Sequence, residues 1–153
     1  MLLPAFIAKV LKASPASYGL ILGAMGLGTI ITSAGLLPRK PLATEKTYYS
    51  AVATGGIVFG LIGLAWNLPA MLILGFMIGC TVAVTWIVSA TAIQVKVNPS
   101  YLGRVHSLLQ TMQMALLPLM YNLYGRLGKA VSLRLLFSAS GLVILLVALA
   151  GLG

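Results

Sequence analysis

The strongest constraint on the fold of this chain is the spacing of its charged residues. Of 153 residues, ten are Lys or Arg and only one, Glu45, is an acid. Uncharged stretches of 26, 49, 21 and 19 residues separate or follow the basic residues. A helix that crosses a bilayer needs roughly 20 predominantly apolar residues, so these stretches accommodate one, two, one and one helices. Charge spacing therefore predicts five membrane spans.

Helix-breaking residues set the boundaries of these spans. As a single helix, the 49-residue stretch would be more than twice as long as a hydrocarbon core of roughly 30 Å. Asn67 and Pro69 mark the point where it turns back. The fourth span contains Pro118, where a kink is expected. The predicted spans are residues 17–37, 48–66, 70–93, 105–124 and 133–152.

These spans predict an all-α fold, a polytopic transmembrane helix bundle that forms a single domain over residues 1–153. Residues 1–8 are also apolar, but they are too few to cross a bilayer. We interpret them as the remnant of a preceding helix. With a bundle of this kind the lipid bilayer is the expected surrounding, and the chain is predicted to be an integral membrane protein.

The net charge of +9 does not indicate a nucleic-acid partner. A nucleic-acid site needs basic residues clustered on one solvated face, whereas here they lie singly or in pairs between apolar stretches. We interpret them as anchors at the lipid headgroups. The short loops on the two sides of the predicted bundle carry five Lys or Arg each, so their bias does not set an orientation.

Few residues could carry out chemistry. One His, one Cys and one acid cannot form a metal site or a catalytic pair, so we expect no enzyme activity, no cofactor and no metal. The predicted spans also contain no Asp or Glu that could relay protons through the membrane.

Glycine pairs one helical turn apart recur in the first three predicted spans. This small-xxx-small spacing lets helix backbones approach closely in membranes, so a tightly packed bundle is expected. The pairs are Gly19 with Gly23, Gly56 with Gly60, and Gly75 with Gly79.

Polar side chains in the third and fourth spans are candidates for a substrate pathway. Thr81, Thr85 and Ser89 recur every four residues and share one helix face. One interpretation is that their hydroxyls bond to carbonyls of their own helix; the other is that Thr85 and Ser89 line a polar pathway. Gln110 and Gln113 in the fourth span are costly to place in lipid because amides need several hydrogen-bond partners. We expect them at a cavity or a helix interface.

The segment NPSYLGRVHSL at residues 98–108 resembles a loop of the major facilitator superfamily, in particular of its macrolide-efflux and siderophore-export branch. In that branch a P-x-x-x-R-G-R-V-x-S-L pattern leads into the eleventh helix. Pro99, Gly103 and Arg104 match it, and Leu102 replaces its first Arg. The resemblance implies the C-terminal half of a twelve-helix exporter, with helices eight to twelve and a remnant of helix seven.

The resemblance also implies what this half would need. The substrate cavity of the family lies between two six-helix halves, so a small molecule would bind only in the complete transporter. We expect the chain to be inactive alone, and its partner to be an N-terminal half or another copy of itself, in a bacterial inner membrane. The alternative is a small non-transporting membrane protein that packs with a partner or self-associates.

Overall fold

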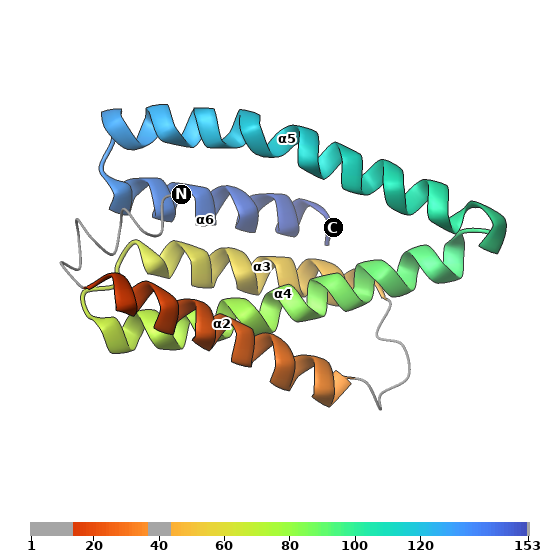
Figure 1. The fold of residues 1–153 in the computed structure, drawn as a ribbon, viewed down its shortest axis with the longest axis horizontal. Helices are drawn as coiled ribbons and strands as arrows, with labels where there is room; N and C mark the ends of the chain where they lie inside the picture. Colours follow the sequence, from red (N-terminus) through yellow and green to blue (C-terminus); the bar gives the residue numbers. More distant parts are fainter. Residues whose placement is uncertain (1–13, 37–43, 153) are drawn as a thin grey trace.

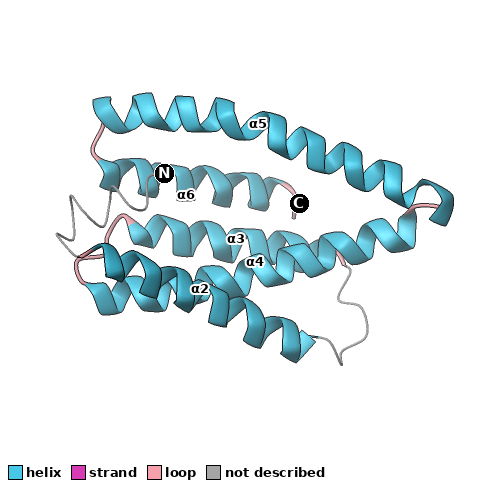
Figure 2. Ribbon diagram, viewed as in Figure 1, coloured by secondary structure: helices cyan, strands magenta, loops and turns pink. Residues whose placement is uncertain are grey.

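A computed structural model describes residues 14–36 and 44–152, and these residues form a bundle of helices (Figures 1 and 2). The elements are α2 (Pro15–Leu36), α3 (Glu45–Ile62), α4 (Leu68–Lys96), the short 3-10 turn η1 (Pro99–Tyr101), α5 (Leu102–Ala130) and α6 (Leu133–Ala150). These described residues contain no strand, which confirms the all-α prediction. The expected helix remnant at residues 1–8 and most of the loop after Pro38 lie outside them.

Each long helix overlaps one predicted span, and local capping explains several boundaries. The side chain of Asn67 accepts a hydrogen bond from the Ala70 amide at 3.0 Å, and Pro69 occupies the first turn of α4. This arrangement starts α4 and separates it from α3. Asn98 accepts a hydrogen bond from the Ser100 amide at 3.1 Å at the start of η1. Asn67 and Pro69 therefore lie at the start of α4, at the predicted turn between the second and third spans.

Three of the helices are long and apolar enough to cross a membrane: Ala16–Leu36, Leu68–Lys96 and Leu133–Ala150. Three of the five predicted spans are supported in this way, because α3 and α5 do not have the length and apolar composition of the other three helices. Helix α3 begins with Glu45 and Lys46, and α5 carries two glutamines within its length. These polar side chains lower the apolar content of the two helices, and their crossing of the membrane stays a prediction.

The helices pack in a way that leaves α5 at one side. Helix α2 packs on α4, and α3 packs on both α4 and α6, whereas α5 makes few contacts with α6. One of these is a hydrogen bond of 3.2 Å between the hydroxyls of Tyr124 and Ser140. Helix α5 continues through Pro118, and its axis changes direction about midway (Figure 1). Residues 102–128 of α5 include none that is buried.

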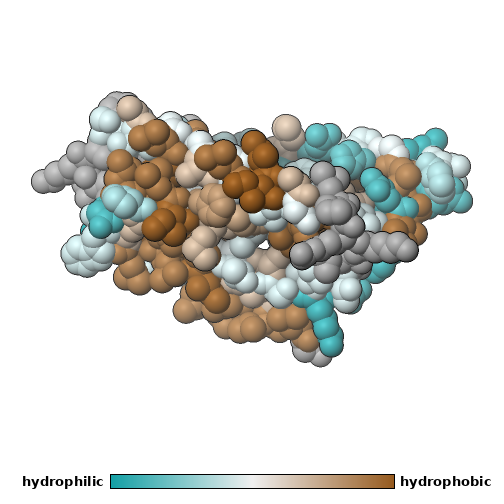
Figure 3. Space-filling model, turned by 90° about the horizontal axis from the view of Figure 1, so that it is seen from below, coloured by the Kyte–Doolittle hydropathy of each residue, from teal (hydrophilic) through white to brown (hydrophobic). Residues whose placement is uncertain are grey.

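The hydrophobic core lies at one end of the bundle. Its buried members come from the first turns of α2, α4 and α6, from the end of α3 and from the α3–α4 turn: Ile21, Ile62, Ala65, Met71 and Phe137. The rings of Phe59 and Phe137 pack with their centres 5.2 Å apart. Outside the core, apolar side chains cover much of the face in Figure 3, and hydrophilic residues gather toward its ends. The outer surface is therefore suited to lipid along the middle of the bundle.

Glycines allow the closest helix contacts. A Cβ atom on Gly79 would overlap the Met25 carbonyl of α2, and one on Gly28 would overlap the Phe76 carbonyl of α4. In the α3–α6 contact a Cβ on Gly56 would lie 2.9 Å from the Leu145 nitrogen. Glycine is required at such positions because any side chain would separate the two backbones.

The predicted glycine pairs differ in how they are used. A Cβ added to Gly75 would lie 3.2 Å from a methyl carbon of Ile21. A Cβ added to Gly60 would have more room, with its nearest atoms at 3.8 Å. Gly19 and Gly23 have no atom within 4 Å of an added Cβ. Helix α2 thus approaches α4 through Gly28, and the face with Gly19 and Gly23 is open in the described part of the chain.

Candidate functional site

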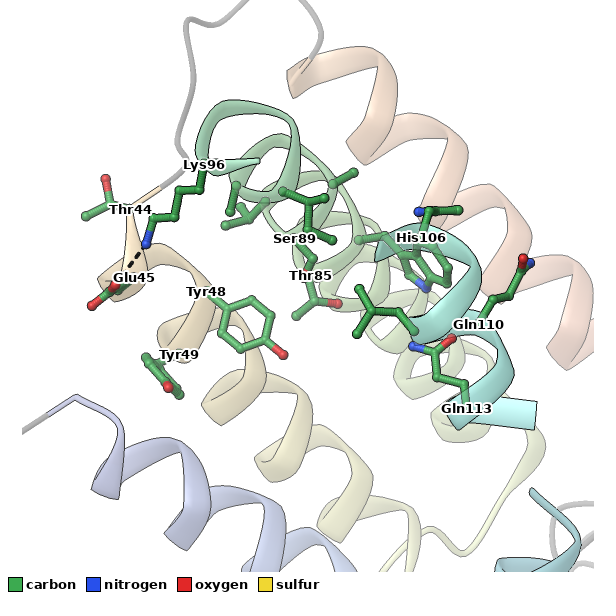
Figure 4. Close-up of a pocket in the computed structure, with 16 residues that line it drawn as sticks. Thr44, Glu45, Tyr48, Tyr49, Thr85, Ser89, Lys96, His106, Gln110 and Gln113 are labelled. Atoms are coloured by element: carbon green, nitrogen blue, oxygen red, sulfur yellow. Dashed lines mark hydrogen bonds and ion pairs between the residues drawn. The ribbon is translucent and has the colours of Figure 1, made fainter. Parts of the chain in front are cut away.

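A cavity of about 610 Å³ lies at the end of the bundle opposite the core (Figure 4). It is formed by the start of α3, the last third of α4 and the first turns of α5. The lining residues are Thr44, Glu45, Tyr48, Tyr49, Thr85, Trp86, Val88, Ser89, Ala90, Ala92, Ile93, Lys96, His106, Leu109, Gln110 and Gln113. All four polar residues predicted for a substrate pathway are among them.

Helix α4 contributes Thr85 and Ser89, which are one turn apart on its cavity face. The Thr85 hydroxyl lies 3.1 Å from the Thr81 carbonyl and 2.9 Å from that of Val82, and so bonds back to its own helix. The Thr85 hydroxyl therefore donates its hydrogen to a carbonyl of its own helix, which is the first of the two interpretations given for these hydroxyls. Its oxygen still faces the cavity, where its lone pairs can accept a hydrogen bond from a ligand.

Helix α5 contributes His106, Gln110 and Gln113, which share one helix face at a spacing of four and three residues. In Figure 4 the side chain of Gln113 extends toward Tyr48 and Thr85, whereas the amide of Gln110 points away from them. Both glutamines are exposed to solvent. An exposed amide at a cavity wall can both donate to and accept from a ligand without being desolvated beforehand.

An ion pair lies at the edge of the cavity. Lys96 at the end of α4 donates to Glu45 at the start of α3, with 3.4 Å between Nζ and Oε1 (Figure 4). The two side chains are 70% and 81% exposed, so the pair contributes little to stability. Glu45 is the only Asp or Glu in the sequence. Its pairing leaves the cavity without an uncompensated carboxylate.

Aromatic rings form part of the cavity wall. Tyr48 and Tyr49 pack edge to face with ring centres 5.4 Å apart, and both line the cavity. Trp86 lines it from α4 and is 60% exposed. The cavity thus presents ring faces beside hydroxyls, amides and an imidazole. This mixture suits a small amphipathic molecule, with apolar surface to bury and a few groups for hydrogen bonds.

Sequence reasoning missed several of these residues. It did not propose His106 for the substrate pathway, although the spacing of His106 from Gln110 and Gln113 already places the three on one helix face. It did not select Tyr48 or Lys96 because nothing local pairs the start of α3 with the end of α4. That pairing follows only from the antiparallel packing of the two helices.

The residues of the loop pattern lie beside the cavity and do not line it. Pro99 is in the turn η1, and Gly103 is in the first turn of α5 with no atom within 4 Å of an added Cβ. The Arg104 guanidinium lies 5.9 Å from the Tyr101 ring centre. The loop therefore joins α4 to α5 at the cavity end of the bundle, with Arg104 held near an aromatic ring.

No protein-family model matches the chain, and neither a curated protein nor a solved structure matches it. A relation to the major facilitator superfamily therefore rests on residues 98–108 and stays a proposal.

Proposed function

We propose that the chain is part of a transmembrane exporter of small amphipathic molecules, and that the cavity between α3, α4 and α5 is where the molecule binds. The observation that carries this proposal is the gathering of Thr85, Ser89, Gln110 and Gln113 in one cavity of about 610 Å³. That volume lies within the range of small-molecule sites, about 300 to 1,000 Å³. Three helices that are long and apolar enough to cross a membrane support the location of the chain in a bilayer.

The shape of the bundle supports transport over simple binding. The cavity lies at one end, and the buried core of Ile21, Met71 and Phe137 lies at the other. A transporter that works by alternating access exposes its site to one side at a time. A bundle that is packed at one end and hollow at the other has the asymmetry of one such state.

The surface of α5 supports the need for a partner. Its large apolar side chains are exposed along the whole helix: Leu108, Met112, Met114, Leu116, Leu119 and Leu123. Its polar residues Gln110 and Gln113 face a cavity with no wall on their outer side in the described chain. We propose that further helices complete this wall, as in the C-terminal half of a major facilitator transporter in a bacterial inner membrane.

A transport assay in vesicles tests this function. The purified chain alone is expected to give no flux of a fluorescent amphipathic compound above empty vesicles, because one wall of the cavity is missing. Affinity purification from the membranes of the source cell is expected to recover a second membrane chain of about six helices. Flux by the chain alone would refute the need for a partner.

The runner-up is a small non-transporting membrane protein that self-associates. The face of α2 with Gly19 and Gly23 favours it, because no atom of the described residues lies within 4 Å of an added Cβ there. Replacing both glycines by Leu is then expected to convert a dimer into a monomer in detergent. If the chain is monomeric before the change and recovers no partner, this alternative is excluded.

A further inference from the structure

We propose that the end of the bundle that holds the buried core binds the phosphate of an anionic lipid, and that Arg134, held against Trp66, is the residue that binds it. This end lies opposite the cavity. The lipid site is therefore separate from the proposed transport function, and the open wall of the cavity does not affect it.

Arg134 is a cation that is held in place without an anion. Its guanidinium carbon lies 4.5 Å from the centre of the Trp66 ring, which is a cation–π contact, and the residue is half-buried. Among the described residues, none forms a hydrogen bond or an ion pair with this guanidinium. A guanidinium carries five N–H donors in a planar fork that matches the oxygens of a phosphate. A phosphate from outside the chain can therefore bind the edge of the group while its face stays against the ring.

The charge at this end of the bundle is positive and uncompensated. Arg126 and Lys129 lie in the last two turns of α5, and Arg134 lies in the first turn of α6. The only acid in the sequence, Glu45, begins α3 at the opposite end of the bundle and pairs with Lys96 there. An anionic ligand would therefore reduce the repulsion among three cations that have no carboxylate of this chain nearby.

Trp66 and Arg134 lie where two of the helices suited to crossing a membrane begin. These helices start at Leu68 and Leu133, so Trp66 comes just before one and Arg134 is the second residue of the other. Both starts lie at the core end of the bundle. Tryptophan and arginine at the end of a span lie at the level of the lipid headgroups. The phosphate groups that are concentrated at this level belong to lipids.

Exposed apolar side chains beside the two residues favour a lipid over a free phosphate. Leu64 precedes Trp66 by two positions, Leu135 follows Arg134, and both leucines are exposed. An acyl chain can cover them, which gains hydrophobic free energy that inorganic phosphate cannot supply. A choline headgroup suits the site less well, because its cation adds to the positive charge and because Arg134 already lies over the Trp66 ring.

Lipid retention by the purified full chain tests this preference. The chain is captured through an affinity tag from neutral-detergent micelles that contain equal amounts of phosphatidylglycerol and phosphatidylcholine with identical acyl chains. The lipids retained per chain are quantified after subtraction of those retained by empty resin. Phosphatidylglycerol is expected to exceed phosphatidylcholine by about three- to fivefold. Excess inorganic phosphate is expected to leave this ratio unchanged, because the free ion has no acyl chains.

Two variants with the same charge separate a site from a general effect of charge. Arg134→Gln and Arg126→Gln each remove one positive charge from the same end of the bundle, but only the first removes the guanidinium held against Trp66. Arg134→Gln is expected to lower the lipid ratio by at least about twofold, whereas Arg126→Gln keeps most of it. Arg134→Lys keeps the charge and loses the planar fork, so an intermediate ratio is expected.

Three results would overturn the proposal. Equal retention of the two lipids by the unchanged chain would show that the core end does not select an anionic lipid. Equal losses in Arg134→Gln and Arg126→Gln would show that net charge, and not a site at Arg134, sets the preference. A preference that disappears in inorganic phosphate would assign the site to the free ion. None of these results bears on the cavity, so the proposed function is tested separately by flux.

Discussion

The guanidinium carbon of Arg134 lies 4.5 Å from the centre of the Trp66 ring. Arg134 is in the first turn of α6, and Trp66 is in the turn between α3 and α4. The contact therefore joins three helices at the end of the bundle that also holds the buried core. It links the helices at the end of the bundle that contains the core, and the cavity lies at the other end.

Replacing Arg134 by Gln is expected to lower the free energy of unfolding by about 0.5 to 1 kcal/mol, the usual contribution of an exposed cation–π contact. Trp66 is 77% exposed, which argues for the lower part of that range. Thermal unfolding of the purified chain in detergent measures the change. Arg126→Gln, at an exposed position of α5, is the control and is expected to have no effect.

Gly79→Ala is expected to destabilise the chain by about 1 to 3 kcal/mol. The added Cβ would overlap the Met25 carbonyl, which is backbone and cannot rotate away. Gly23→Ala is the matched control, because it has open space and replaces a poor helix former by a good one. The two changes should shift the unfolding temperature in opposite directions. A shift in the same direction would contradict the close packing of α2 on α4.

Amide hydrogens in α5 are expected to exchange faster than those of α4 when the chain is alone in detergent. Residues 106–123 of α5 are all exposed, whereas α4 buries Met71, Ala83 and Val88. Local opening is easier where few apolar contacts hold a helix. Mass spectrometry of exchange in peptides from the two helices compares them. Equal protection would mean that another surface already covers α5.

Reporter tags test whether α3 and α5 cross the membrane. The five-span prediction places a tag after Asn67 and a tag after Val131 on one side, and a tag after Asn98 on the other. If α5 lies along the surface, the tags after Asn98 and Val131 fall on the same side. If α3 does not cross the membrane, the tags after Thr44 and Asn67 fall on the same side. Labelling with an impermeant reagent in intact cells gives the result.

Gln113→Leu is expected to weaken the binding of a hydroxyl-bearing probe by about three- to tenfold, the usual loss on removing one hydrogen bond. Gln110→Leu is its control, with a smaller effect, because its amide points away from Tyr48 and Thr85 (Figure 4). Equilibrium dialysis with 2-naphthalenemethanol measures both. Equal losses would mean that the ligand lies closer to the outer side of α5.

The helical composition of the fold followed from the sequence alone. Gaps between charges predicted where five helices lie, and Asn67 with Pro69 predicted the turn between α3 and α4. These are local effects, since a capping side chain or a proline acts on its own turn. The sequence also pointed to Thr85, Ser89, Gln110 and Gln113, because polar residues stand out in apolar helices.

The tertiary structure alone decided which helices meet. Gly79 belonged to a predicted glycine pair and Gly28 did not, and only the packing of α2 on α4 shows that both positions require glycine. The pairing of Glu45 with Lys96 joins residues 51 positions apart, and it exists because α3 and α4 run antiparallel from a shared turn. A cavity is made by the spaces between helices, and periodicity in one helix carries no information about its neighbours.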